Sequence, residues 1–320
     1  VSKVLNGVRE RIDPQTYERV WVHAVKVGYR GKGMTPHAPL TAAGSRQIGV
    51  VLRAGLKTFV QSNFFSHVQV GLHEALQPHG FSTVMLGSED TLDASAAGPL
   101  PPALVVLGAV KPAYLRALRQ HTRRIVAING SYPGLCHSVL SNDAQALDLL
   151  VEHLIALGHR QLGWLGGLPE HPIHIARFEA FRAALAAHDL PPPNKDLCAI
   201  RTDGADRQQG REAALELLAR NSRQPTALVC FNGVMARGAV NALLQSGHKL
   251  PADVSVVAVD ATRVCVEETP HITCASPIPE KLGAAAARLL LDSTGAEDED
   301  FQTTVLSSQL RLGETSGPAK

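Results

Sequence analysis

The stretch PTALVCFNGVMARGAVNALLQSGHKLPADVSVVAVD (residues 225–260) decides the fold, because it joins two short apolar runs through one helical segment. The runs ALVCF (227–231) and VSVVAV (254–259) have the length and β-branched content of buried strands. Between them, residues 234–246 repeat apolar side chains at the spacing of one helix face. A strand, a helix and a second strand are typical of a parallel βαβ unit. The stretch therefore predicts an α/β fold.

The same alternation continues outward from this unit and forms two series. In the C-terminal series, strand candidates and helical segments precede the unit at 144–157, 161–165, 174–188, 197–200 and 207–220. In the N-terminal series they lie at 48–52, 66–79, 81–86, 103–107, 112–121 and 124–128. A helix at 280–291 and a strand pair near 303–312 close the chain. The sequence therefore predicts two consecutive parallel-sheet domains, and ligands of such sheets bind beyond the carboxyl ends of the strands.

Composition agrees with this organisation. The chain has 320 residues, of which 45% are hydrophobic and only 4% aromatic. That length exceeds a single ordinary core and suits two or three packed units. Abundant Ala, Leu and Val favour helices packed on a sheet over an aromatic-rich sandwich.

Basic side chains gather at the beginning of the chain. Residues 1–47 hold eight Lys and Arg against three acidic residues, and the remainder carries 23 basic and 26 acidic residues. A basic head on a mildly acidic body is suited to binding a phosphate backbone through the head alone. An ordinary solvated basic face would produce the same imbalance.

The basic head has a helical part and an irregular part. Asp13 and Pro14 are typical of a helix start, and Gly28 of a helix end. The segment RGKGMTPHAPLTAAGSR (30–46) shows no periodicity and predicts a linker. The opening VSKVLNG (1–7) has helical spacing without a start signal, so we expect that the front of this head is missing.

The sequence lacks the signals that several other classes of protein carry. The five cysteines are scattered without a C-x-x-C pair, so neither a disulfide framework nor a zinc site is expected. A signal segment and an apolar stretch long enough for a membrane span are both missing, which favours a cytoplasmic location without membrane attachment. Without a nucleophile elbow, a P-loop or a complete metal motif, the sequence predicts no enzyme, no cofactor and no metal.

A set of motifs follows in a fixed order along nearly the whole chain. They are VSKVLNG (1–7), ERIDPQTYERVWVHAVKVGYR (10–30), SNFF (62–65), VEHLIALGHRQLGWLGG (151–167), ARFEAFRAAL (176–185), PTALVCFNGVMARGAV (225–240), LPADVSVVAVD (250–260) and TPHITCASPIPEKLGAAAARLLL (269–291). In this order and spacing they resemble the lactose-repressor/galactose-repressor (LacI/GalR) family of bacterial transcription factors.

The resemblance implies two similar periplasmic-binding-protein-like subdomains, joined by a hinge that the chain crosses three times. The implied parts are a partial helix-turn-helix head (1–30), a linker (31–47), an N-subdomain (48–160 with 277–293) and a C-subdomain (161–276 with 294–320). The crossings are expected near 159–162, 275–278 and 294–303.

The resemblance also implies an effector site. The corresponding positions here are Asn63, Phe64, Asn142, Arg177, Asn232, Asp260 and Ser276. Arg177 offers a planar fork of five donors, and Asp260 ends a predicted strand. The ordinary alternatives are an exposed helical arginine, a turn-capping aspartate and a core phenylalanine. Asn142 and Asp143 stand in the reverse of the family's usual order, so either of them could reach the site.

Two departures from the family pattern affect the expectations. Ala205 stands where many members place an aromatic platform, so a polyhydroxylated ligand such as a sugar fits better than a flat base. The segment SEDTLDASAAGPLPP (88–102) is too short for the helix that the family generally fits between two strands. This departure affects the expected geometry of a dimer and leaves the expectation of dimerisation unchanged.

In the head, the resemblance implies DNA contacts by Ser2, Lys3 and Asn6. Two half-sites on operator DNA would require a homodimer. Pro36 and Pro39 oppose the family's hinge helix, so residues 31–46 are predicted to be non-helical.

The predicted function is a ligand-responsive, sequence-specific regulator, expected to be a repressor, that senses a small polyhydroxylated metabolite. The alternative is a periplasmic-type sugar-binding protein without a role in DNA binding, which would share the two-domain architecture. The basic head and the missing signal segment argue against it.

Overall fold

The computed structural model describes residues 46–56, 63–95, 97, 99–220, 224–292 and 300–320, together with positions 16 and 20. These residues form two compact units, each built around one six-stranded sheet. Of the described residues, the first unit takes those before 58, those in 70–140 and those in 283–304, and the second takes those in 59–69, 141–282 and 305–320. The predicted α/β class with two similar sheets is confirmed.

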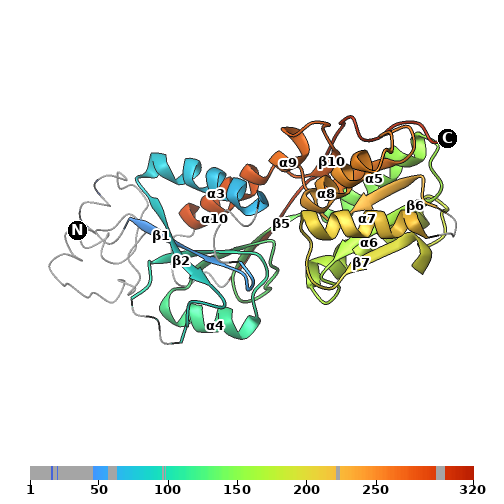
Figure 1. The fold of residues 1–320 in the computed structure, drawn as a ribbon. Coiled ribbons are helices and arrows are strands. Elements are labelled where there is room, and N and C mark those ends of the chain that lie inside the picture. The colour runs from blue at the N-terminus through green and yellow to red at the C-terminus, as the bar shows by residue number, and fades with distance from the viewer. Residues whose placement is uncertain are drawn as a thin grey trace. The chain divides into compact units, whose positions relative to one another are not determined.

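The sheet of the first unit has the strand order β11-β5-β4-β3-β1-β2 (Figure 1). Its strands are β1 (Gln47–Leu52), β2 (Ser82–Ser88), β3 (Ala103–Leu107), β4 (Arg124–Ile128), β5 (His137–Ser141) and β11 (Thr303–Leu306). β1 to β5 pair in parallel, and β3 and β4 are buried at every position. Such strands need cover on both faces.

Helices provide that cover. α4 (Pro112–His121) lies on one face, and α3 (Asn63–Leu76) and α10 (Pro279–Asp292) lie on the other (Figure 1). Right-handed crossovers explain this arrangement, because α3 leads from β1 to the strand on one side and α4 leads from β3 to the strand on the other. Between β2 and β3 the described residues form turns and no helix, as expected from the shortness of 88–102.

The sheet of the second unit has the strand order β12-β10-β9-β8-β6-β7. Its strands are β6 (Leu162–Gly167), β7 (Cys198–Arg201), β8 (Ala227–Cys230), β9 (Ser255–Val259), β10 (Thr273–Ser276) and β12 (Gln309–Arg311). β12 alone is antiparallel to its neighbour. Residues 225–260 form the predicted βαβ unit in this sheet, since α8 (Gly233–Gln245) joins β8 to β9.

Four long helices cover the second sheet in two pairs. α5 (Asp143–Ala156) packs with α6 (Pro172–Ala187), and α7 (Arg207–Ala219) packs with α8. The strand order places α6 and α7 on opposite faces, because the chain runs from β6 to one side through α6 and returns across to β8 through α7. Trp164 and Phe181 are fully buried in the resulting core. All strands except β12 therefore end at one edge of the sheet, where the short helix α9 (Arg263–Val266) and the first turns of the long helices lie.

The boundaries between the two units fall along the chain after residues 58, 69, 140, 282 and 304. α5 packs on β9, β10 and β12 and belongs to the second unit, whereas the resemblance implied a passage near 159–162, after this helix. β11 joins the first sheet and β12 the second, so the strand pair expected near 303–312 is divided between the two sheets. The apolar face of α5 is completed by the second core, where Leu147, Leu150 and Leu154 are buried, and sequence periodicity does not say which sheet receives a helix.

Two strands were not predicted. β5 (HSVLS) and β10 (TCAS) contain few apolar residues, and their strand conformation depends on pairing with β4 and β9. The predicted head and linker, including the prediction of a non-helical linker, lie almost wholly outside the described residues. Among the described helices, none is long and apolar enough to cross a membrane.

Candidate functional site

Arg177 is the central group of the candidate site. It lies in the second turn of α6, which begins where the chain leaves the carboxyl end of β6. Nδ1 of His171 caps this helix by accepting a hydrogen bond from the N–H of Ile173 (3.2 Å), and Pro172 occupies the first helical position. The Arg177 residue is only 5% exposed, so its guanidinium needs partners within the protein.

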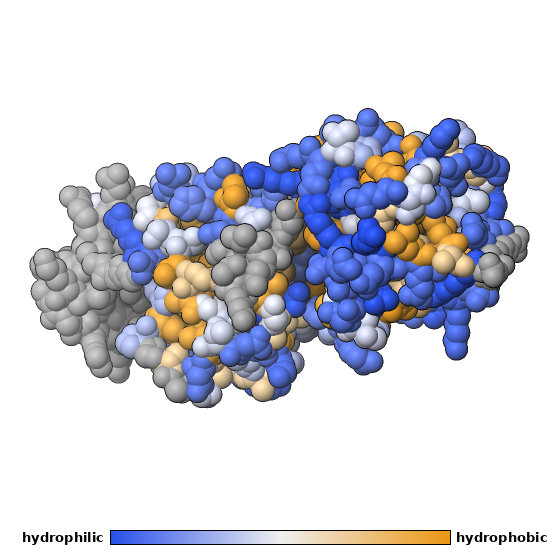
Figure 2. Space-filling model, viewed as in Figure 1, coloured by the Kyte–Doolittle hydropathy of each residue, from blue (hydrophilic) through white to orange (hydrophobic). Residues whose placement is uncertain are grey.

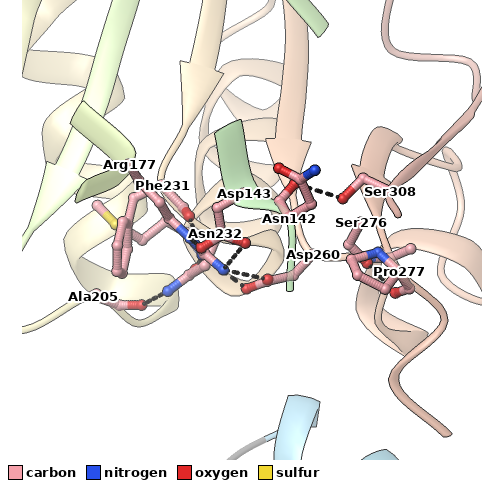
Figure 3. Close-up of polar contacts among 12 residues, drawn as sticks. Asn142, Asp143, Arg177, Ala205, Phe231, Asn232, Asp260, Ser276, Pro277 and Ser308 are labelled. Carbon is pink, nitrogen blue, oxygen red and sulfur yellow. Dashed lines mark hydrogen bonds and ion pairs between the residues drawn. The ribbon is translucent and has the colours of Figure 1, made fainter. Parts of the chain in front are cut away.

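All five N–H groups of the Arg177 guanidinium donate to protein oxygens (Figure 3). Asp143 accepts from Nε at Oδ2 (2.7 Å) and from Nη2 at Oδ1 (3.4 Å). Asp260 accepts from Nη2 at Oδ1 (2.8 Å) and from Nη1 at Oδ2 (3.3 Å). The carbonyl oxygen of Phe231 accepts the remaining bond from Nη1 (2.7 Å). Both carboxylates therefore bind the guanidinium through two oxygens, the geometry for which arginine is suited.

Burial and charge act in opposite directions on this centre. Burial alone lowers the pKa of Arg177, but Asp143 and Asp260 outweigh it and raise that pKa above its usual value. Burial raises the pKa of the Asp260 carboxyl above its ordinary value, although the charge and hydrogen bonds of Arg177 act to lower it. Two carboxylates thus surround one permanently charged guanidinium, and the fully ionised cluster has an excess of negative charge.

Asp260 has an unusual backbone conformation. It follows β9 directly, and its φ of 78° lies in the left-handed region that side-chain-bearing residues rarely adopt. Its N–H donates to the carbonyl oxygen of Ala275 (3.2 Å), and its own carbonyl oxygen accepts from Sγ of Cys265 (3.4 Å). The neighbouring strand and α9 therefore hold this strained residue in place, as is common at functional sites.

An aromatic layer supports the guanidinium. Cζ of Arg177 lies 5.2 Å from the centre of the Phe231 ring, a cation–π contact. His174 lies against Phe231 and stacks on Phe178, with ring centres 5.6 and 6.1 Å apart respectively. Burial lowers the pKa of His174, and its Nε2 accepts a long hydrogen bond from Nε1 of Trp164 (3.4 Å). This histidine is therefore part of the packing below Arg177.

The structure gives Asn142, Asn232 and Ser276 local bonding partners (Figure 3). Asn142 caps α5 by accepting from the N–H of Gln145 (3.1 Å). Asn232 caps α8 by accepting from the N–H of Met235 (2.7 Å) and also donates to the carbonyl oxygen of Ala205 (2.9 Å).

Ser276 accepts from the N–H of Ala261 (3.0 Å) and donates to the carbonyl oxygen of Pro277 (2.5 Å). All three polar side chains therefore shape the backbone around the Arg177 centre. Asn and Ser side chains ordinarily cap helices and turns in this way.

The remaining predicted site residues contribute none of the hydrogen bonds described above. Asn63 and Phe64 begin α3, where the Phe64 ring makes an edge-to-face contact with Phe65, which is buried. The predicted DNA contacts Ser2, Lys3 and Asn6 lie outside the described residues. In the described part of the chain, no group of three His, Cys, Asp or Glu side chains is placed to hold a metal ion.

The sequence did not decide whether Asp143 or its neighbour Asn142 contacts the site. The reversed order of Asn142 and Asp143 indicates that either residue could reach the site, and Asn142 is the one that the sequence analysis places there. In the structure Asn142 is the helix cap and Asp143 contacts Arg177. The first helical position of α5 turns the Asp143 side chain toward α6, and only the packing of the two helices reveals this.

Comparison with known proteins places these features in context. A family model described as a periplasmic binding protein-like domain matches residues 151–316. The HTH-type transcriptional repressor PurR of Proteus mirabilis (strain HI4320) is 26% identical over 99% of this chain and 93% of the relative.

Solved structures show the same fold. A LacI family transcriptional regulator from Enterococcus faecium with bound ribose superposes with a TM-score of 0.74 at 22% identity, covering 86% of this chain and 100% of the other. The transcriptional regulator CelR in complex with cellobiose superposes with a TM-score of 0.73 at 22% identity, covering 98% and 94%.

Proposed function

Because this chain belongs to the periplasmic-binding-protein-like family, we propose that it is a regulator of the LacI/GalR type that represses transcription in response to a small polyhydroxylated effector. Operator DNA and the effector are its two partners. The protein is a regulator and not an enzyme, as its relatives are transcriptional repressors.

The observation that carries this proposal is the Arg177 centre at the carboxyl edge of the second sheet. Arg177 follows β6, Phe231 follows β8 and Asp260 follows β9, so three adjacent strands deliver their polar groups to one place. This edge is where open α/β sheets bind ligands. The strained backbone of Asp260 further supports a functional role for the centre.

A sugar or polyol is the effector class that these side chains favour. The Asp143 and Asp260 carboxylates are strong acceptors for hydroxyl protons. Ala205, at the bond to Asn232, offers no aromatic face on which a planar base could stack. Two structural relatives bind ribose and cellobiose, which are compounds of this class. Arg177, Asp260, Asn142, Asn232 and Ser276 form the proposed effector site in the second unit, with Asn63 and Phe64 of α3 as further contacts.

DNA binding is assigned to the basic head, with Ser2, Lys3 and Asn6 as the proposed contacts. A repressor acts where the chromosome is, so the proposed location is the cytoplasm. A two-fold operator requires two heads, so we expect a homodimer. Several large apolar side chains remain at least 38% exposed and could contribute to such a contact: Val70, Ile175, Ile200, Leu244, Val305 and Leu312. Figure 2 shows apolar surface on both units.

Regulation then requires that the effector bind one of two states better than the other, since equal affinity would shift nothing. A thermal-shift screen against sugars, polyols, sugar acids and nucleobases, followed by mobility-shift assays on operator-library DNA, tests the whole proposal. We expect stabilisation by at least one sugar or polyol and an effect of that compound on DNA binding. Stabilisation by nucleobases alone would overturn the effector class, and catalytic turnover of a bound sugar would overturn the regulatory role.

A further inference from the structure

All N–H groups of the Arg177 guanidinium are already hydrogen-bonded, but the carboxylate oxygens around it can accept further hydrogen bonds. Each carboxylate oxygen has two lone pairs. Each of the four oxygens of Asp143 and Asp260 accepts one bond from Arg177, and no described residue other than Arg177 pairs with either carboxylate. The side chains of Asp143 and Asp260 are 22% and 12% exposed. The centre therefore presents unused acceptor positions toward solvent and no free guanidinium donor.

The charge of the centre favours the same ligand groups as its free hydrogen-bond acceptors do. A ligand that approaches the centre meets two carboxylates before it can reach the guanidinium between them. A carboxylate or phosphate would find no donor from Arg177 and would be repelled by the excess negative charge. A hydroxyl or ammonium group could donate to the free lone pairs, and an ammonium would also neutralise the excess charge.

We propose that Asp143 is a specificity-determining residue that converts the arginine centre into an acceptor site. It admits effectors that present hydroxyl or ammonium donors and excludes effectors that present carboxylate or phosphate groups. The inference rests on the proposed function, because it defines the ligand chemistry of the same site. Asp143 determines this selectivity because its bonds occupy Nε and one N–H of Nη2, and these two donors form the fork that a guanidinium uses to bind an anion.

The competing explanation is an ion pair that only stabilises the packing of α5 on α6. The two explanations differ in what happens when the carboxylate is removed. A structural pair would lose stability without gaining any ligand. A selectivity residue would release the fork of Arg177, and the site would gain affinity for anions.

Sulfate is a suitable probe, because its binding depends on charge and a donor fork and not on sugar stereochemistry. The full chain is compared as wild type, Asp143→Ala and Asp143→Asn, with circular dichroism as the test of folding. Asp148→Asn is the matched control, since Asp148 lies on the same helix, is 55% exposed and forms an ion pair only with His188 among the described residues (3.6 Å). Calorimetric titration with sodium sulfate against sodium chloride of equal ionic strength measures the affinity, and the side-chain Nε–H resonance of Arg177 reports the site.

For Asp143→Ala we expect sulfate affinity at least about tenfold higher than in wild type, with a shift of the Arg177 resonance. Asp143→Asn should show a smaller gain, because its amide oxygen can still accept from the guanidinium, and Asp148→Asn should behave as wild type. Equal sulfate affinity of folded Asp143→Ala, folded Asp143→Asn and wild type would overturn the inference, as would sulfate binding by wild type that shifts the Arg177 resonance.

A second arm uses glucose, glucosamine and gluconate, which differ in charge but share most hydroxyls. Gluconate binding to wild type at least as tight as glucose or glucosamine binding would also overturn the inference, while leaving a sugar-responsive regulator intact. Failure of every sugar and polyol to bind wild type would instead overturn the proposed effector class, and the sulfate comparison would still decide the role of Asp143.

Discussion

Nη2 of Arg177 and Oδ1 of Asp260 lie 2.8 Å apart, although 83 residues separate them in the sequence. Arg177 belongs to α6 and Asp260 follows β9, and Asp143 at the start of α5 bonds the same guanidinium. Three elements of the second unit therefore meet at one ion-paired centre. The centre should consequently affect folding as well as ligand binding.

Removal of the Arg177 guanidinium should destabilise the protein. Arg177→Ala leaves the carboxylates of Asp143 and Asp260 close together without a counter-charge, so we expect the free energy of unfolding to fall by about 3 to 5 kcal/mol. Urea denaturation measures this change. Arg182→Ala is the control on the same helix, because Arg182 is 48% exposed and pairs only with Glu179 among the described residues, and its loss should stay below about 1 kcal/mol. A comparable loss for both variants would contradict the prediction.

The left-handed backbone of Asp260 predicts an inverted preference between glycine and alanine. Asp260→Gly and Asp260→Ala both remove the carboxylate, but glycine adopts a φ of 78° without strain. We expect the glycine variant to be more stable than the alanine variant by about 1 kcal/mol. At Asp148, inside α5, the order should reverse by about 1 kcal/mol, because alanine favours helix. Chemical denaturation of the four variants tests the prediction, and an alanine variant at 260 as stable as the glycine variant would refute it.

Buried histidines should make stability depend on pH. His159 is 2% exposed, with Nε2 2.9 Å from the carbonyl oxygen of Gly317 and Nδ1 2.9 Å from the hydroxyl of Thr226. Burial lowers the pKa of His159, and burial with the charge of His159 lowers that of His153. The unfolded chain takes up these protons near pH 6.5 and the folded chain only at lower pH, so acid favours unfolding.

We therefore expect the free energy of unfolding to decrease as the pH falls through about 6.5, by up to about 1.4 kcal/mol per pH unit for each such histidine. Urea titrations at pH 7.5, 6.5 and 5.5 provide the measurement. His159→Asn should be less stable at pH 7.5 but should show a shallower decline. A flat profile for the wild-type protein over this interval is the result that would rule the prediction out.

Dimerisation should not depend on the head. We expect a chain that begins at residue 47 to remain a two-fold dimer at micromolar concentration, because pairing of the heads on two half-sites has to be maintained by the regulatory units. Sedimentation equilibrium gives the mass directly. A monomer of the shortened chain beside a dimer of the full chain would place the contact in residues 1–46 instead.

Local patterns were sufficient to predict the fold and part of the site. The runs ALVCF and VSVVAV and the helix between them could be assigned from apolar spacing alone, since strand and helix periodicities differ. Arg177 and Asp260 followed from these assignments and from the family resemblance, because the residue after a parallel strand lies at the binding edge of its sheet. The structure brings these two residues together.

Tertiary structure alone decided how the polar side chains are used. The sequence placed Asn142, Asn232 and Ser276 at the edge of the sheet, but their bonds to nearby backbone groups depend on the final turn geometry. The choice of Asp143 as partner of Arg177, and of the second sheet as the support of α5, likewise depends on packing between distant segments. An amino-acid sequence fixes which donors and acceptors a chain carries. Which of them meet is decided by long-range packing, because a hydrogen bond requires two atoms within about 3 Å and a local pattern contains no such distance.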